Sequence, residues 1–314
     1  MFKSLNFLSA KNSSKNGTVT IIKHELIRDK LALLSFIFIV LLVLFLIASL
    51  FFVDTNAVLH SRLDLTRLHQ PPSHNYWLGT DQQGRDGVAM LIIATRNTLA
   101  ITFLATAFSS TFGIIYGLIS GYIGGIVDQI MSSVIDIITS IPNLIAMLLL
   151  INFFGGAFNL QIFILVLSIL SWTNVARVIR TRVIQEKERE YVIAAKTLGT
   201  THFKIMFKKL IPNLSTIIIT SIVLNAVSII IIEAGIAFFN FQASFIGGPL
   251  PSVLAAFSGD TPTLGTLLVS TGYTHILRFR WWRWVPATVV IVLLMFSINV
   301  VGNMLNRAAD KEQR

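Results

Sequence analysis

Two carboxylates stand inside stretches of sequence that are otherwise apolar. Asp136 lies in the run around residues 130–153, and Glu233 lies in the run around residues 214–238. If these runs cross a membrane, each carboxylate is costly unless it is paired, hydrated or neutralised, which makes both candidates for a functional position. Three roles stay open for Glu233: packing at a gate or pore, a simple position at the membrane boundary, or relay of a proton. Asp136 has the alternative of lying near a helix end.

A second group of charged residues lies close together in WLGTDQQGRDGV, upstream of the second long apolar run. Asp81, Arg85 and Asp86 are spaced around Gly79 and Gly84. Two glycines around an aspartate and an arginine make a compact turn that hydrogen-bonds to itself. We favour a structural brace beside an outer gate over a direct contact with a solute.

The sequence lacks the patterns of the common hydrolases. It contains no P-loop, no HExxH and no GxSxG, and its histidines match no metal spacing. The absence of cysteine excludes disulfides, thiolate zinc sites and cysteine nucleophiles. We therefore expect a protein that is not an enzyme, with no catalytic residue, no metal and no cofactor bound by this chain.

Composition points to a membrane. Hydrophobic residues make up 54% of the chain and charged residues 13%, and the mean hydropathy is +0.74. Soluble domains carry about 25% charged residues, so no ordinary soluble core accounts for this balance. The net charge of +10 comes from basic residues in loops beside apolar runs, without an aromatic-basic motif, which argues against nucleic-acid binding.

The candidate residues are carried by apolar runs long enough to cross a membrane. Residues 31–53 are uncharged and, at about 1.5 Å per residue, span roughly 30 Å of hydrocarbon. This length exceeds the apolar segment of a cleaved signal peptide, so we predict a retained first helix. Five further runs lie at about 97–121, 130–153, 160–176, 214–238 and 284–305. The sequence predicts an all-α membrane protein with about six transmembrane helices, the third kinked at Pro142.

Lysine and arginine residues set the expected orientation of these helices. The first 30 residues, the loop between the fourth and fifth helices and the C-terminal tail are all rich in basic residues, which places the three segments in the cytoplasm. The exception on the outer side is a cluster made of Arg278, Arg280, Trp281, Trp282, Arg283 and Trp284. We expect an interfacial belt there, with a contact to solute or partner as the alternative.

The loop between the fourth and fifth helices is too polar to span a membrane and too patterned for a linker. In REYVIAAKTLGTTHFKIMFKKLIPN, residues 189–213, we predict a short helix, a break at Gly199, a second amphipathic helix and a stop at Pro212. The second helix has one apolar and one basic face, so it can lie along a membrane surface.

This loop resembles the EAA motif of ABC importer permeases, with matches at Ala194, Ala195, Gly199, Leu210 and Pro212. The resemblance implies that the short helix is a coupling helix which docks into a cytoplasmic ATPase. Ile193 stands where the motif has its glutamate. Glu190, three residues earlier on the same helical face, is expected to substitute for it in part.

Other segments are similar to permeases of the dipeptide, oligopeptide and nickel group. LGTDQQGRD matches a signature of that group, and SSVIDIITSIPNLI keeps the aspartate and the Ser-Ile-Pro of another while lacking its arginine. TPTLGTLL and INVVGNMLNRAAD are similar to elements near the C-terminus of these permeases. The resemblance covers about residues 26–310 and points to the second, C-type permease of such an importer.

The resemblance implies a type I ABC importer permease fold in a bacterial inner or plasma membrane. The implied partners are a second permease, two ATPases that use ATP and magnesium, and an extracytoplasmic binding protein that selects the solute. Peptides are the expected solute, with nickel chelates, opines and antimicrobial peptides open. The alternative function is a secondary transporter driven by an ion gradient, for which the sequence shows no convincing repeat.

These inferences divide the chain into segments with distinct expected roles. Residues 1–30 are a cytoplasmic segment, 31–53 the first transmembrane helix and 54–95 an extracytoplasmic segment. Residues 96–305 form the transmembrane permease domain, with the coupling loop at about 186–213, and 306–314 are a cytoplasmic tail. An insertion at 245–260 lies outside; we favour a variable loop there over a contact with a binding protein.

Overall fold

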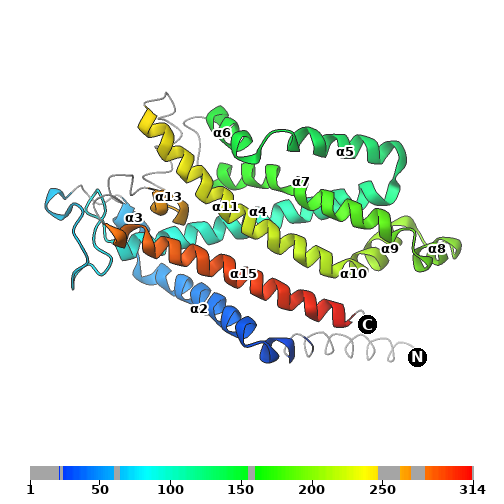
Figure 1. The fold of residues 1–314 in the computed structure, drawn as a ribbon, viewed down its shortest axis with the longest axis horizontal. Helices are drawn as coiled ribbons and strands as arrows, with labels where there is room; N and C mark the ends of the chain where they lie inside the picture. Colours follow the sequence, from blue (N-terminus) through cyan, green and yellow to red (C-terminus); the bar gives the residue numbers. More distant parts are fainter. Residues whose placement is uncertain are drawn as a thin grey trace.

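The computed structural model describes residues 21, 24–59, 64–154, 160–246, 262–269 and 280–312. These residues form helices joined by turns, and the one β contact among them is an isolated bridge between Thr80 and Asp86. Figure 1 shows the long helices running side by side in one bundle, with the start of α2 and the end of α15 at the same end. The fold is all-α, as the sequence predicts.

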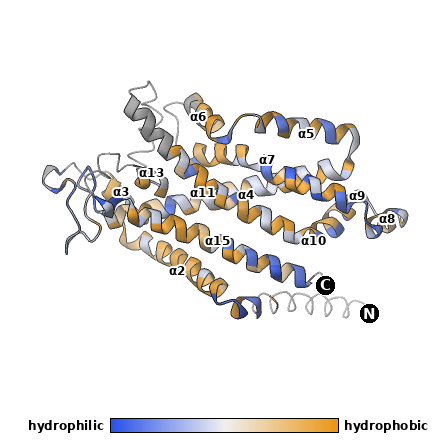
Figure 2. Cartoon of the chain, in the orientation of Figure 1, coloured by the Kyte–Doolittle hydropathy of each residue, from blue (hydrophilic) through white to orange (hydrophobic). Residues whose placement is uncertain are grey.

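Five of the described helices are long and apolar enough to cross a membrane. They are α2 (Lys30–Phe52), α4 (Gly87–Ile123), α7 (Leu160–Glu186), α11 (Ser215–Ile246) and α15 (Val285–Glu312). Each contains most of a predicted apolar run, so these five predictions are confirmed. Figure 2 shows apolar residues along the middle of the bundle and polar residues gathered toward its ends.

Two of these helices, α4 and α7, extend ten residues beyond their predicted apolar runs. α4 begins at Gly87, ten residues before the predicted run, because the Asp86 carboxylate caps it by accepting the N–H of Val88 at 3.1 Å. α7 continues ten residues past position 176. Arg180, in this extension, pairs with Asp128 on α5 (Gly125–Thr139), which holds the extension against the bundle. Apolar run length therefore starts α4 too late and ends α7 too early.

The third apolar run is not one kinked helix, so that prediction is wrong. It forms α5 and α6 (Asn143–Phe154), separated by a break at residues 140–142. Pro142 has no N–H to continue α5 and pushes the residue before it out of helical geometry. Its carbonyl instead accepts the N–H groups of Ile145 and Ala146 and starts α6. The two helices follow one another along α7, so a broken pair of helices stands where the third crossing was predicted (Figure 1).

A row of glycines brings α4 and α7 into backbone contact. A Cβ placed on Gly113, Gly117 or Gly121 would lie 2.7, 2.5 and 2.7 Å from carbonyl oxygens of α7. The four-residue spacing puts all three on one helical face, as in the small-xxx-small pattern of membrane helix pairs. The backbones of α4 and α7 therefore lie in direct contact along this row of glycines.

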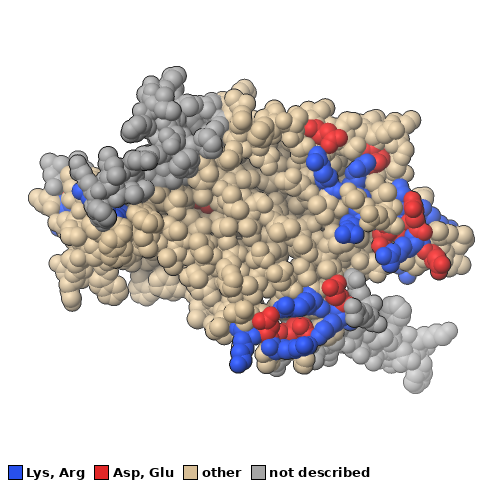
Figure 3. All heavy atoms as spheres, viewed as in Figure 1, with Lys and Arg blue, Asp and Glu red and all other residues tan. Residues whose placement is uncertain are grey.

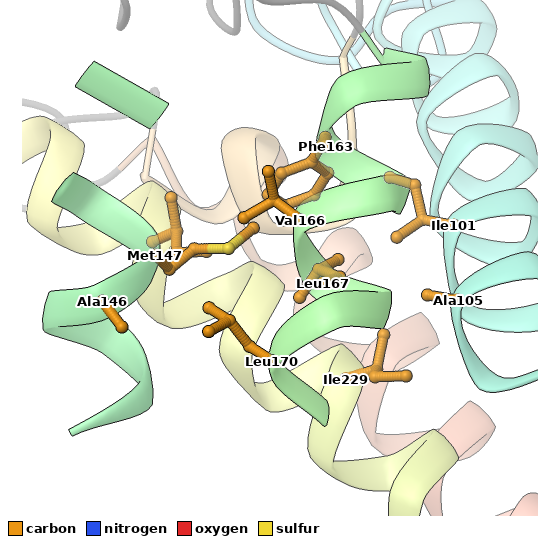
Figure 4. Close-up of a cluster of buried hydrophobic side chains, with 10 residues drawn as sticks. Ile101, Ala105, Ala146, Met147, Phe163, Val166, Leu167, Leu170 and Ile229 are labelled. Atoms are coloured by element: carbon orange, nitrogen blue, oxygen red, sulfur yellow. The ribbon is translucent and has the colours of Figure 1, made fainter. Parts of the chain in front are cut away.

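The largest buried cluster joins four helices around α7. Figure 4 shows the α7 side chains Phe163, Val166, Leu167 and Leu170. They lie between Ile101 of α4 on one side and residues of α6 and α11 on the other. A second cluster at the end of the bundle packs Leu118 and Tyr122 of α4 against Ile179 of α7 and the loop after it. These two clusters connect the middle of the bundle to the loop that carries the EAA-like motif.

Candidate functional site

The segment between α7 and α11 forms a compact tip at the end of the bundle where α2 begins and α15 ends (Figure 1). It contains α8 (Glu190–Thr197), α9 (His202–Ile205), the π-helical turn η3 (Met206–Leu210) and α10 (Ile211–Asn213). The predicted short helix and the break after it are confirmed. The second helix does not stop at Pro212, because proline is tolerated in the first turn of α10, and the chain turns at Leu214 instead.

The two faces of α8 differ in burial. Val192 and Ala195 are buried against Leu118, Tyr122 and other members of the second cluster. The opposite stripe, at the i, i+3, i+4 spacing of one helical face, is exposed and holds Glu190, Ile193 and Ala194. Ile193 is 52% exposed, so the residue that replaces the motif's glutamate points away from the protein, on the same side as Glu190.

Gly199 ends α8 in a left-handed conformation, with φ of 72°. The N–H of Thr200 donates to the carbonyl of Ala195 and that of Gly199 to the carbonyl of Lys196, each at 3.0 Å. This pair of bonds is the Schellman motif, which favours glycine because a Cβ is strained at positive φ. A Cβ on Gly199 would meet no neighbour within 4 Å, so the requirement is conformational rather than steric.

Several contacts fix the tip to the ends of α4 and α7. The Tyr122 hydroxyl lies 2.9 Å from Nδ1 of His202, and the Lys196 ammonium lies 5.3 Å from the centre of the Tyr122 ring. The Lys187 ammonium donates to the carbonyl of Gly121 at 2.9 Å. Together with buried Leu210, these contacts make the tip one unit with the bundle.

Part of the predicted amphipathic face points outward. Leu210 is fully buried, whereas Phe203, which the sequence assigns to the apolar face, is 66% exposed, and Pro212 is exposed as well. The π-helical turn η3 inserts a residue into the helical repeat, so the residues before it are rotated relative to those after it. Leu198, at 84% exposure, lies with Phe203 on the outside of the tip.

At the opposite end of the bundle, LGTDQQGRD folds on itself. The Asp81 carboxylate accepts the N–H groups of Gln83 at 2.7 Å and Arg85 at 2.9 Å, and it pairs with Nε of Arg85 at 2.6 Å. Both side chains of this ion pair are buried, at 9% and 3% exposure. A buried pair of this kind is stable only when its other hydrogen bonds are satisfied, which the two backbone donors achieve for Asp81.

The glycines of this turn sit where only glycine fits. Gly79 and Gly84 have φ of 61° and 81°. A Cβ on Gly79 would lie 2.3 Å from the carbonyl of Gln70 and 2.8 Å from Nε1 of Trp282. The turn is thereby pressed against the residues that precede α15, and Asp86 joins it to α4 as the helix cap.

The arginine–tryptophan cluster divides between two environments. Trp281 is 54% exposed, as expected for an interfacial belt. Arg283 instead turns inward, with Nη1 3.2 Å from Nδ1 of His69, and burial lowers the pKa of its guanidinium although Asp81 acts in the opposite direction. Arg278 and most of the 245–260 insertion lie outside the described residues.

Glu233 is buried at 3% exposure where three helices meet. Its carboxylate accepts the Thr98 hydroxyl of α4 at 3.0 Å and the Gly265 N–H of α13 (Leu264–Val269) at 3.3 Å. The Glu233 carboxylate is therefore enclosed by residues of α4, α11 and α13. The sequence identified Glu233 as a candidate but not the partners that surround it.

Asp136 and Pro142 lie apart from Glu233. The Asp136 carboxylate is exposed and pairs with Nη2 of Arg177 at 3.0 Å, and the same nitrogen donates to the Thr139 hydroxyl at 2.7 Å. Pro142 is exposed at the break between α5 and α6. The structure therefore does not gather the three intramembrane candidates into one site.

Sequence reasoning missed two polar links inside the bundle. Asp128 accepts from Arg180 at 2.5 and 2.7 Å, joining α5 to α7 near the tip. The Asn225 amide of α11 donates to Ser109 at 2.7 Å and to Ser110 at 3.0 Å, both on α4. The four-residue spacing of Gly113, Gly117 and Gly121 is a signal in the sequence for close helix packing. In contrast, no residue near Asn225 in the sequence predicts its partners on α4.

Comparisons with known proteins agree with this architecture. The family described as the binding-protein-dependent transport system inner membrane component matches residues 113–314. Oligopeptide transport system permease protein OppC of Lactococcus lactis subsp. lactis (strain IL1403) is 36% identical, over 96% of this chain and 98% of its own. Dipeptide transport system permease protein DppC of Bacillus subtilis (strain 168) is 32% identical, over 93% and 85%.

A solved structure shows a similar fold. The inward-facing MetNI methionine ABC transporter superposes with a TM-score of 0.55 at 20% identity, over 70% of this chain and 96% of the matched one. The family match covers more than half of the chain, and the relatives align over nearly its whole length. The chain therefore belongs to the family of binding-protein-dependent transport system inner membrane components.

Proposed function

We propose that the chain is the transmembrane permease subunit of an ATP-driven ABC importer for oligopeptides or dipeptides. Family membership and the names of the relatives support this assignment, and the fold is that of an ABC importer permease. The single observation that carries the mechanism is α8, whose exposed stripe lies on a base anchored to α4 and α7. Neither the comparisons nor the fold favours the gradient-driven alternative.

The proposed partners follow from the division of labour in such an importer. Two ATPase subunits would bind ATP and magnesium and hydrolyse ATP, because this chain has no recognised arrangement for doing so. A second permease would complete the translocation path, and an extracytoplasmic protein would deliver the peptide. The end that carries α8, the start of α2 and the end of α15 would face the cytoplasm, in agreement with its basic residues.

The geometry suggests how a partner's motion reaches the membrane. A push on Glu190, Ala194 or Gly199 would pass through buried Ala195 and Leu210 into the second cluster, which contains residues of both α4 and α7. Because the three glycines hold these two helices together, they would move as one body. Glu233 and the Asp81–Arg85 turn are proposed to hold the outer ends of that body, as gate packing and brace.

Copurification with an ATPase assay tests the assignment. The tagged chain would be extracted from membranes in mild detergent as wild type, Ala194→Arg and Gln129→Arg. Ala194 is on the exposed stripe of α8, whereas Gln129 is exposed on α5 at the same end of the bundle. We expect wild type and Gln129→Arg to recover a second permease and ATPases, and Ala194→Arg to lose the ATPases while it keeps the second permease.

Either of two results would contradict the proposal. If wild type purifies alone and no ATPase activity is recovered, the importer assignment fails and a gradient-driven transporter becomes the better account. If Ala194→Arg retains the ATPases and their activity as fully as Gln129→Arg does, the exposed stripe of α8 is not the coupling surface.

A further inference from the structure

An open cavity of about 540 Å³ lies where α2 begins and α15 ends. Charged residues from both helices line it, and Figure 3 shows them as a cluster of its own, apart from the charged residues around α8. Within the cavity the Lys311 ammonium bonds the carboxylate of buried Glu25, and Arg307 bonds Asp29 at 2.5 Å. These two pairs fasten the start of α2 to the last turns of α15.

Two cations in the cavity are left over from this pairing. Arg28 and Lys30 both line it and are exposed, and among the described residues neither has a carboxylate within 4.0 Å. The third carboxylate of the lining, Asp310, accepts the Thr216 hydroxyl of α11 at 2.8 Å. The lining thus carries four cations and three carboxylates, and because Glu25 and Asp29 are paired with Lys311 and Arg307, its excess positive charge lies at Arg28 and Lys30.

The cavity adjoins apolar surface on α2. Leu31 and Leu34 of α2 are exposed by 59% and 63%, Ile27 just before α2 is exposed by 60%, and Leu31 also lines the cavity. The 23 residues of α2 reach across roughly 35 Å at about 1.5 Å each, so its first turn lies at the depth of lipid headgroups. A ligand that satisfies both surfaces has an anionic head joined to an apolar chain.

We propose that this cavity binds the phosphate headgroup of an anionic phospholipid, with an acyl chain along Leu31 and Leu34. The Arg28 guanidinium offers paired donors to a phosphodiester, and the Lys30 ammonium adds a second charge. Basic pockets between helices at a membrane surface are suited to such headgroups. The proposal rests on the proposed function only in that the chain spans a membrane, not on its ATPase partners.

Lipid titration of the detergent-purified protein tests the site, with the midpoint of thermal unfolding as the readout. Dioctanoyl phosphatidylglycerol is compared with dioctanoyl phosphatidylcholine and with glycerol 3-phosphate, which supplies the phosphate without chains. The variant is Arg28→Gln/Lys30→Gln. The control, Lys208→Gln/Lys209→Gln, removes the same charge from exposed positions on the tip.

We expect phosphatidylglycerol to stabilise wild type at lower concentration than phosphatidylcholine, and glycerol 3-phosphate to have little effect. At about 1 kcal/mol for each cation, Arg28→Gln/Lys30→Gln should need roughly thirty-fold more phosphatidylglycerol. The tip variant should stay within about three-fold of wild type, because its two lysines lie outside the cavity and a headgroup bound there is beyond a screening length of about 10 Å from them. Exchange of the two cations, Arg28→Lys/Lys30→Arg, should keep the response.

Three results would overturn the site. Equal stabilisation by the two lipids removes the need for an anion, and an equal response to glycerol 3-phosphate makes it a simple phosphate site. Equal loss in the two double variants makes the attraction non-specific. None of these results depends on whether ATPases copurify, so failure of this site and failure of the importer assignment are separate outcomes.

Discussion

The hydroxyl of Thr98 on α4 donates to the Glu233 carboxylate on α11 at 3.0 Å, and the same hydroxyl oxygen accepts the Leu264 N–H at 2.9 Å. Glu233 also accepts the N–H of Gly265. One carboxylate and one hydroxyl thus satisfy the first backbone donors of α13 and join three elements. A short helix after the 245–260 insertion is thereby held to the two long helices beside it.

Removal of the Glu233 carboxylate should loosen this junction. In Glu233→Ala the Thr98 hydroxyl and the Gly265 N–H lose their acceptor, which costs about 1–3 kcal/mol of stability for a buried donor. Glu233→Gln keeps an acceptor oxygen and should lose less. The midpoint of thermal unfolding in detergent measures both. If Glu233→Gln loses as much as Glu233→Ala, an acceptor oxygen at this position is not enough to hold the junction.

The contact between α4 and α7 should not tolerate a methyl group at its centre. In Gly117→Ala the new Cβ would lie 2.5 Å from the carbonyl oxygen of Ala176, so the helices must separate. We expect a loss of roughly 1–3 kcal/mol, larger than the gain from alanine's helix propensity.

A matched glycine supplies the control for that substitution. Gly235→Ala meets only the flexible end of Leu144, at 3.2 Å, and should be nearly neutral. Thermal unfolding of the two variants, side by side, measures the difference. Equal stability of the two would mean that α4 and α7 are not held by backbone contact at Gly117.

The left-handed end of α8 should depend on the residue at Gly199. Gly199→Ala costs about 1 kcal/mol because its Cβ is strained at φ of 72°, whereas Gly199→Asn is tolerated better at this conformation. Hydrogen exchange of the α8 amides should be faster in Gly199→Ala and near wild type in Gly199→Asn. Unchanged exchange in Gly199→Ala would show that the Schellman bonds do not hold α8 in place.

The link between Glu25 and Lys311 predicts a pH dependence. The hydrogen bond from Lys311 and its charge lower the pKa of Glu25, so this carboxylate stabilises the fold above its unfolded pKa of about 4.3 and ceases to do so as pH falls through the lowered value. The thermal midpoint should be flat from neutral pH to about pH 5 and fall below about pH 4.

Two variants separate this link from general acid effects. Glu25→Gln should be less stable than wild type at neutral pH and should show a shallower fall in acid. Glu188→Gln changes an exposed carboxylate for which no ion pair is seen among the described residues, and it should follow wild type. An equally steep fall in Glu25→Gln would mean that other groups govern the acid limb.

Much of the fold follows from local signals that the sequence displays. Apolar run length located five of the long helices, and Gly199 located the end of α8, because each depends on residues adjacent in the chain. At the break before Asn143 the sequence predicts only a kink. Hydropathy does not register that Pro142 removes one donor and restricts its neighbour, although both effects are local.

The site was less predictable because its contacts join distant residues. The sequence identified Glu233 from its unusual setting, but its partner Thr98 is 135 positions away and looks like any helical threonine. Likewise the ion pair of Arg307 with Asp29 joins the two ends of the chain. The pair follows from the packing of α2 against α15, and the residue spacing within either segment does not predict it.

The central claim is that the exposed stripe of α8 contacts an ATPase, and site-directed cross-linking tests it most directly. The chain has no cysteine, so Ala194→Cys and Ala195→Cys each introduce a single thiol, one exposed and the neighbour 7% exposed. Each would be labelled in the purified complex with a maleimide photo-cross-linker. The account predicts a product with the ATPase from position 194 and little from position 195. No product from position 194, in a complex that retains its ATPase, would contradict it.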